Sequence, residues 1–352
     1  MISAPRSSFS ATKRRHRLPW PEGQPFRILA IDGGGIKGIF PAALLSNWEQ
    51  RYVGGRSISE CFDLITGTST GGILALGLGA GKTAGEMLKM YLEEGESIFP
   101  PGWLWKILRR IRGSAFYRYD RSALTTALRS ALRDKTLSES SARLCIPAFE
   151  GHHGEVYIFK TPHHPDYKID GTEYLVKIGQ ATAAAPSYFS ALDSGGYRFV
   201  DGGIWANNPI MIGITDALAC YDIEPSQLEV LSIGCGRKPL RVGWAKAIGG
   251  FISWSNVIVA AMDSQSQNAM GQARLIGGPE NVVRIEPEVA APIGLDDWQR
   301  ASTELPPEAD RAAKKHDGQI QRFFNAPRMR PKFYWPPNVD VPQLSSFGHM
   351  AD

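Results

Sequence analysis

Residues 61–76 read Cys-Phe-Asp-Leu-Ile-Thr-Gly-Thr-Ser-Thr-Gly-Gly-Ile-Leu-Ala-Leu. The apolar run at the start predicts a buried strand, and the apolar residues at the end predict a helix. Between them lies a Gly-x-Ser-x-Gly turn, in which Gly67 and Gly71 let the backbone bend tightly around Ser69. Such a turn exposes the Ser69 hydroxyl and places the Thr70 amide and the positive end of the helix beside it. The segment indicates a nucleophilic serine, although a plain structural turn is the alternative for the pentapeptide alone.

A second strand, glycine turn and helix precede this one. The apolar run Phe26–Asp32 stops at three consecutive glycines, and Gly33–Gly38 satisfies Gly-x-Gly-x-x-Gly, the pattern of a dinucleotide-dependent oxidoreductase. In the other interpretation the amides of Gly33, Gly34 and Gly35 form an oxyanion hole, and Lys37 adds positive charge at its rim. We favour the hydrolase because it gives both glycine turns one chemistry.

The serine needs a base, and the histidines are poor candidates. Of the seven, only His316 and His349 follow the central region, and both lie in polar, tail-like sequence. Asp201 offers another solution, since it ends the apolar run Tyr197–Val200 and begins an Asp-Gly-Gly turn. At a strand end, with Gly202 and Gly203 behind it, a partly desolvated carboxylate could accept the serine proton directly. A turn-forming aspartate is the alternative.

Apolar runs alternate with helical patterns along the chain, and Leu228–Ile233 and Val282–Ile285 are two of the runs that predict strands. Such alternation predicts an α/β fold, with a largely parallel central sheet flanked by helices in three layers. Past Glu286 the chain is rich in proline and aromatic residues, which predicts an extended but packed strap. We divide the chain into a basic disordered leader (1–24), a catalytic domain (25–300) and a C-terminal strap (301–352) that packs on it.

Composition excludes several classes of protein. The 352 residues are 43% hydrophobic and 21% charged, as in ordinary globular proteins and unlike disordered, collagen-like or coiled-coil chains. Four cysteines lie too far apart for a zinc ribbon or a disulfide scaffold, which favours a reducing compartment. The net charge of +4 comes from the leader, because residues 1–17 hold five basic residues and no acidic one. No stretch is apolar enough to predict a membrane span.

Three motifs in order resemble the signature blocks of the patatin-like phospholipases: Asp32–Gly38, Gly67–Gly71 and Asp201-Gly202-Gly203. Ala181–Phe189 and Asn207-Asn208-Pro209 are further typical pieces, so the likeness runs from about Phe26 to Gly236. The resemblance implies a patatin-like three-layer fold and hydrolysis of lipid acyl esters by a Ser-Asp dyad. It assigns Ser69 as nucleophile and Asp201 as base, with no metal and no cofactor for catalysis.

Within that family the chain is similar to bacterial effectors of CBASS anti-phage signalling, of the CapV and CapE type. That similarity implies a cytoplasmic enzyme, switched on by a cyclic dinucleotide, that degrades membrane phospholipid peripherally at the inner membrane. It also allows an activator-induced homo-oligomer, and no DNA or RNA polymer is expected as partner. The nucleotide-binding residues are not assigned. A non-catalytic lipid-binding scaffold on the same fold stays an alternative.

Basic and aromatic residues alternate in Trp103–Arg121, including Arg109, Arg110 and Arg118. The pattern is typical of an interfacial helix at anionic lipid, and arginine beside aromatic rings also suits phosphates and stacked bases. We expect a lid, membrane-docking or nucleotide-binding element there. The alternative is a core-facing helix with a solvated basic side.

Overall fold

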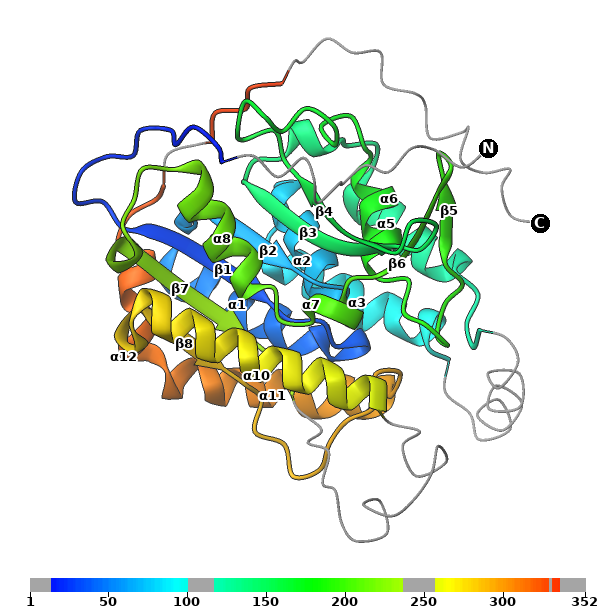
Figure 1. The fold of residues 1–352 in the computed structure, drawn as a ribbon. Helices are drawn as coiled ribbons and strands as arrows, with labels where there is room; N and C mark the ends of the chain where they lie inside the picture. Colours follow the sequence, from blue (N-terminus) through cyan, green and yellow to red (C-terminus); the bar gives the residue numbers. More distant parts are fainter. Residues whose placement is uncertain (1–13, 101–116, 237–256, 329–330, 336–352) are drawn as a thin grey trace, which may run out of the picture.

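The computed structural model describes residues 14–100, 117–236, 257–328 and 331–335. A mixed sheet of eight strands forms the middle layer, in the order β5-β6-β3-β2-β1-β7-β8, with β4 paired to β3 (Figure 1). Pairing is parallel from β3 through β2, β1 and β7 to β8, and antiparallel where β3 meets β4 and β6 and where β5 meets β6. The strands are β1 (Phe26–Ile31), β2 (Leu64–Gly67), β3 (Leu144–Glu150), β4 (Glu155–Lys160), β5 (Leu192–Ser194), β6 (Tyr197–Asp201), β7 (Leu228–Ile233) and β8 (Val282–Ile285).

Helices cover both faces of the sheet, and each face has its own apolar core. On one face pack α1 (Ile39–Tyr52), α2 (Thr70–Gly79), α3 (Ala84–Ile98), α5 (Ser122–Leu132), α6 (Leu175–Thr182) and α11 (Trp298–Lys315). On the other pack α8 (Ile210–Cys220) and α10 (Val257–Gly277). The short helices α7 (Gly203–Ala206) and α12 (Asp317–Ile320) complete those that the structure describes. The predicted three-layer α/β arrangement with a largely parallel sheet is confirmed.

The two central strands bring both glycine turns to one edge. All six residues of β1 and all four of β2 are buried, as continuous apolar strands covered on two faces should be. The two strands run parallel with Ile31 opposite Gly67, so that their carboxyl ends lie side by side. Ligands bind at the carboxyl ends of strands in open α/β sheets.

The C-terminal prediction is wrong in part, because residues 298–315 form α11 and not an extended strap. The boundary at residue 300 therefore falls inside a helix. Prolines 306 and 307 suggested extended chain, yet Ala301, Leu305 and Ala309 recur at helical spacing and bury their side chains in the core that α1 also lines. Burial of that face outweighs the two backbone hydrogen bonds that the prolines remove. The expectation that this segment packs on the rest of the chain holds.

The N-terminal prediction also needs correction. Residues 1–13 lie outside the description, but the part of the leader that is described is not disordered. The Leu18 amide donates to the Cys220 carbonyl at 2.7 Å, and the Leu18 carbonyl accepts from the Asp222 amide at 2.8 Å. Trp20 packs against Phe26 and Tyr221. These apolar contacts order residues that composition alone marked as a solvated tail.

None of the described helices is both long enough and apolar enough to span a membrane.

Candidate active site

Ser69 occupies a sharp turn between β2 and α2. Its backbone lies at φ 54° and ψ −122°, a strained conformation that few non-glycine residues adopt. Glycine is required on both sides, since a Cβ at Gly67 would lie 2.1 Å from the Gly71 carbonyl oxygen and one at Gly71 would lie 2.3 Å from the Ile31 carbonyl oxygen. The motif therefore forms a tight turn against β1, as expected from a nucleophile elbow.

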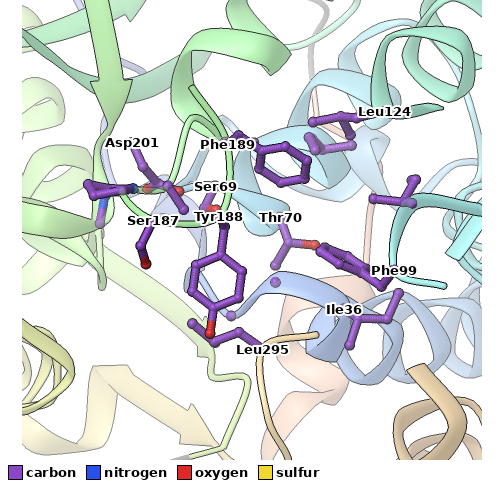
Figure 2. Close-up of a pocket in the computed structure, with 18 of the residues that line it drawn as sticks. Ile36, Ser69, Thr70, Phe99, Leu124, Ser187, Tyr188, Phe189, Asp201 and Leu295 are labelled. Atoms are coloured by element: carbon purple, nitrogen blue, oxygen red, sulfur yellow. Dashed lines mark hydrogen bonds between the residues drawn. The ribbon is translucent and has the colours of Figure 1, made fainter. Parts of the chain in front are cut away.

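Asp201 ends β6 beside this turn, and its carboxylate accepts a hydrogen bond from the Ser69 hydroxyl (Figure 2). A second hydrogen bond comes from the Gly203 amide at 2.6 Å. The carboxyl is buried, and this burial raises its pKa to about 6, against the two hydrogen bonds, which lower it. A carboxylate with a pKa close to neutrality is a far better proton acceptor than a solvated one.

Gly202 brings the Asp201 turn against β3. A Cβ at Gly202 would lie 2.4 Å from the Pro147 carbonyl oxygen, so only glycine fits. The same carbonyl accepts a hydrogen bond from Thr182 Oγ1 at 2.7 Å, and Thr182 Oγ1 accepts one from the Ser69 amide at 3.0 Å. Thr182 thus ties the Ser69 turn to the strand that supports Asp201. Thr182 lies in the block Ala181–Phe189, but no local sequence pattern predicts this role.

The triple glycine supplies free amides beside the serine. The Gly33 amide is engaged, because it donates to the Asn207 carbonyl at 3.0 Å. The amides of Gly34 and Gly35 have no hydrogen-bond partner among the described residues, and both glycines line the same cavity as Ser69. Three glycines were expected to bind an oxyanion. The amides of Gly34 and Gly35 are placed to donate to it, whereas the Gly33 amide holds the turn through its bond to Asn207.

Glycine is needed here for contacts within the protein. A Cβ at Gly34 would lie 2.3 Å from Cys235 Cβ, one at Gly35 would lie 2.3 Å from the Leu295 carbonyl oxygen, and one at Gly38 would lie 2.0 Å from Thr70 Oγ1. The Gly-x-Gly-x-x-Gly pattern thus has a cause other than the approach of a pyrophosphate. The dinucleotide interpretation is not favoured.

Lys37 is not among the described residues that line the Ser69 cavity, although its side chain passes beside Gly34. Its ammonium donates to the Gly236 carbonyl at 2.9 Å and lines a separate cavity of about 60 Å³. That cavity also contains the buried ion pair of Asp32 with Arg284, whose Nη1–Oδ1 distance is 2.8 Å. Burial raises the pKa of Asp32 to about 6 although Arg284 opposes this shift. Lys37 lies within the short 3-10 helix Gly35–Gly38, and its side chain is buried.

The Ser69 cavity has a volume of about 250 Å³ and is mostly apolar. Figure 2 shows Ser69 and Asp201 together on one side, with Leu124 and Phe99 across from them. An acyl chain fits such a lining, because apolar surface is buried without unpaired polar groups. The apolar residues that line it are Ile36, Ile73, Tyr91, Ile98, Phe99, Leu124, Ala183, Ala185, Pro186, Tyr188, Phe189, Ile204, Met262 and Leu295.

A cluster of metal-ligating types lies elsewhere, on the α8 side of the sheet. Cys145, His163 and Asp216 place one ligand atom each within 4.8 Å of one another, all buried. Asp216 is already saturated, since it contacts His163 Nε2 at 2.7 Å and the Lys160 ammonium at 2.7 Å. Lys160 supplies the positive charge that a cation would bring, so the donor set does not fit a metal ion in this arrangement.

Residues 101–116, most of the basic and aromatic segment, lie outside the described residues, Arg109 and Arg110 included. Its end is described and borders the cavity. The Arg118 amide donates to the Ser187 carbonyl at 3.0 Å, and the Tyr119 amide donates to the Tyr188 carbonyl at 2.9 Å. Arg118, Ser187 and Tyr188 all line the cavity. The sequence pattern pointed to this segment but not to which of its arginines reaches the site.

Comparison with known proteins agrees with the motifs. A model of the family described as patatin-like phospholipase matches residues 29–214. Three curated relatives carry the name cGAMP-activated phospholipase. Those of Escherichia coli and Vibrio cholerae are each 35% identical over 59% of this chain, and that of Pseudomonas aeruginosa is 31% identical over 91% of it. The matched regions span 61%, 63% and 98% of the three relatives' own lengths, so the chain matches about three fifths of the first two.

The family match covers the second half of β1 and all of β2, β3 and β6, which carry both glycine turns and Asp201. The predicted resemblance and fold are thereby confirmed, and the family match supports the prediction of an ester hydrolase. The chain belongs to the patatin-like phospholipase family.

Proposed function

We propose that this chain hydrolyses acyl esters of membrane phospholipids through Ser69 and Asp201. The observation that carries the proposal is the hydrogen bond from the Ser69 hydroxyl to the buried Asp201 carboxylate. Beside it lie the Gly34 and Gly35 amides, which have no partner within the described part of the chain. Nucleophile, base and oxyanion donors are the three parts that acyl transfer needs, and all of them line one apolar cavity.

In the proposed reaction Ser69 Oγ attacks the ester carbonyl while its proton moves to Asp201. The Gly34 and Gly35 amides hold the negative oxygen of the tetrahedral intermediate. Collapse of the intermediate breaks the ester bond, and Asp201 returns the proton to the departing lysophospholipid alkoxide. A water molecule, deprotonated by the same carboxylate, then attacks the acyl-enzyme, and the fatty acid leaves as Ser69 regains its proton. The raised pKa of Asp201 suits both directions of transfer.

Regulation by a cyclic dinucleotide forms part of the proposal. It is supported by the three relatives named cGAMP-activated phospholipase, one of which aligns over 91% of this chain. The enzyme would then act peripherally on the inner membrane from the cytoplasm, and activation would involve a homo-oligomer. The catalytic part of the proposal does not depend on the regulatory part, because all residues of the Ser69 site come from one chain.

The test is release of fatty acid from phospholipid vesicles, with and without cGAMP and other cyclic dinucleotides. We expect activator-dependent release that falls on the order of 10⁴-fold in Ser69→Ala and in Asp201→Asn. The matched controls are Ser226→Ala and Asp193→Asn, two exposed positions away from the cavity, which should keep wild-type rates. Release that survives Ser69→Ala would refute the mechanism. Vesicle binding without turnover under every activator would support the scaffold alternative.

A further inference from the structure

Arg118 is the one cationic side chain among the described residues that line the Ser69 cavity. Its backbone is held on the Ser187–Tyr188 segment by the amide hydrogen bond to the Ser187 carbonyl. Its guanidinium lies over the Tyr188 ring, 4.8 Å from the ring centre. The backbone hydrogen bond to Ser187 and the stacking on Tyr188 together fix the position of the Arg118 charge. Arg118 therefore forms a defined part of the cavity wall.

The charge of Arg118 is only partly compensated. Its nearest carboxylate oxygen is Asp296 Oδ2, at 3.7 Å from Nη1, which is longer than a hydrogen bond. That oxygen already accepts a hydrogen bond from the Tyr119 hydroxyl at 2.8 Å. Arg118 Nε is buried and has no hydrogen-bond partner among the described residues, while the guanidinium donates a side-chain hydrogen bond to the Tyr188 hydroxyl. Counting the described residues alone, most of the five N–H donors of Arg118 have no partner and could bind a ligand.

The position of this cation matches the chemistry of a phospholipid. Figure 2 shows Tyr188, on which Arg118 stacks, on the same side as Ser187 and Leu295 and across the cavity from Phe99 and Leu124. The apolar side suits an acyl chain, and Ser69 lies at the ester. Near Arg118 the substrate should carry a negative charge. In a phospholipid that charge is on the phosphodiester, which lies a few bonds from the ester. Guanidinium and phosphate pair through two parallel hydrogen bonds.

We propose that Arg118 binds the phosphodiester of the lipid substrate and thereby selects phospholipids over neutral glycerolipids. The inference rests on the proposed hydrolysis at Ser69 and adds a specificity residue to it. A cyclic dinucleotide also carries phosphodiesters, but the observations favour the lipid, because Arg118 shares its cavity with the nucleophile and base.

The first test compares two substrates with the same acyl chains, dihexanoylphosphatidylglycerol and dihexanoylglycerol, at saturating cGAMP. Arg118→Gln should lower the ratio of kcat/KM for the phospholipid over the diacylglycerol by about ten- to a hundredfold, the usual value of a charge-assisted hydrogen bond. Arg118→Lys should fall between, since it keeps the charge and loses the fork. Arg198→Gln is the matched control, because Arg198 is exposed and pairs with Asp193 away from the cavity. An unchanged ratio in Arg118→Gln would overturn the proposal.

The second test measures binding without turnover, in the Ser69→Ala background. Arg118→Gln should weaken the affinity for the phosphatidylglycerol by the same factor and leave that for the diacylglycerol within about twofold. In the enzyme that retains Ser69, Arg118→Gln should leave the cGAMP concentration for half-maximal activation unchanged. A shift in that concentration with equal lipid affinity would assign Arg118 to the nucleotide and refute the proposal. If the wild type hydrolyses neither lipid, the proposed function fails, while the binding comparison still decides the role of Arg118.

Discussion

Replacement of Thr182 by valine tests whether the hydroxyl that joins the two halves of the site positions the nucleophile. Thr182 is fully buried, and its Oγ1 links the Ser69 amide (3.0 Å) to the Pro147 carbonyl (2.7 Å). Valine has nearly the same shape, so packing against Gly72 is retained while two buried backbone groups lose their partner. Each such loss costs about 1–3 kcal/mol, which predicts a fall of about 2–6 kcal/mol in the free energy of unfolding.

The same change should slow the reaction. Ser69 holds a strained backbone conformation, and its amide hydrogen bond to Thr182 opposes relaxation of the turn. A displacement of about 1 Å at a reacting group costs on the order of 100-fold in rate, so kcat should fall by about that factor with little change in KM. Because Thr182 positions Ser69 and does not exchange protons, the pH midpoint of kcat/KM should stay at its wild-type value.

The assays are urea unfolding and the rate of fatty acid release across pH, for Thr182→Val and Thr182→Ser. Serine keeps the hydroxyl and should restore most of kcat and of the stability. A valine variant with wild-type kcat would show that the Thr182 hydroxyl does not position the nucleophile. A loss in Thr182→Ser as large as that in Thr182→Val would show that the hydroxyl alone does not hold the turn, and would refute the hydrogen-bond argument.

Two further predictions concern Asp201 and the glycine loop. Because Asp201 must be ionised to accept a proton and its pKa is about 6, kcat/KM should rise with pH through about 6. Its pKa is raised on folding, so the stability it contributes is full below about pH 4 and lost as pH rises through 6. Asp201→Asn should therefore increase the free energy of unfolding at pH 8 by on the order of 2–3 kcal/mol while it abolishes turnover, and no gain in chemical denaturation would contradict this. Gly34→Ala should lose more than about 100-fold in kcat, since its Cβ would lie 2.3 Å from Cys235 Cβ and would displace an oxyanion donor. Cys235→Gly in the same chain should recover part of that loss, and failure to do so would place the cause elsewhere.

Short apolar runs predicted most of the sheet. The runs Leu228–Ile233 and Val282–Ile285 coincide with β7 and β8, because buried strands of a parallel sheet need apolar residues on both faces. The strand expected from Cys61 begins only at Leu64, since Ile58–Cys61 forms a short 3-10 helix. The strand β5 was missed, because three residues with one buried side chain carry no periodic signal.

The helix α11 shows where local rules fail. Two adjacent prolines indicate extended chain when only neighbours in sequence are considered. The helix forms because its alanine and leucine side chains are buried in the core that α1 also lines, about 250 residues earlier in the chain. Lys37 is a similar case. Its neighbours in sequence, Gly34, Gly35 and Ile36, line the Ser69 cavity, but its ammonium donates to the Gly236 carbonyl.

The chemical identity of the site was readable from the chain itself: a serine between small residues, three glycines after a strand, and an aspartate on a glycine turn, each of them set by local backbone geometry. Contacts between distant segments were decided by the tertiary structure alone. Packing of β6 against β3 brings Asp201 to Ser69 and buries it, which sets its pKa. Packing also engages the Gly33 amide, leaves those of Gly34 and Gly35 without a partner among the residues that the structure describes, and places Thr182 and Arg118 at the site. Burial and hydrogen bonding depend on what surrounds a residue in space, and a linear pattern does not hold that information.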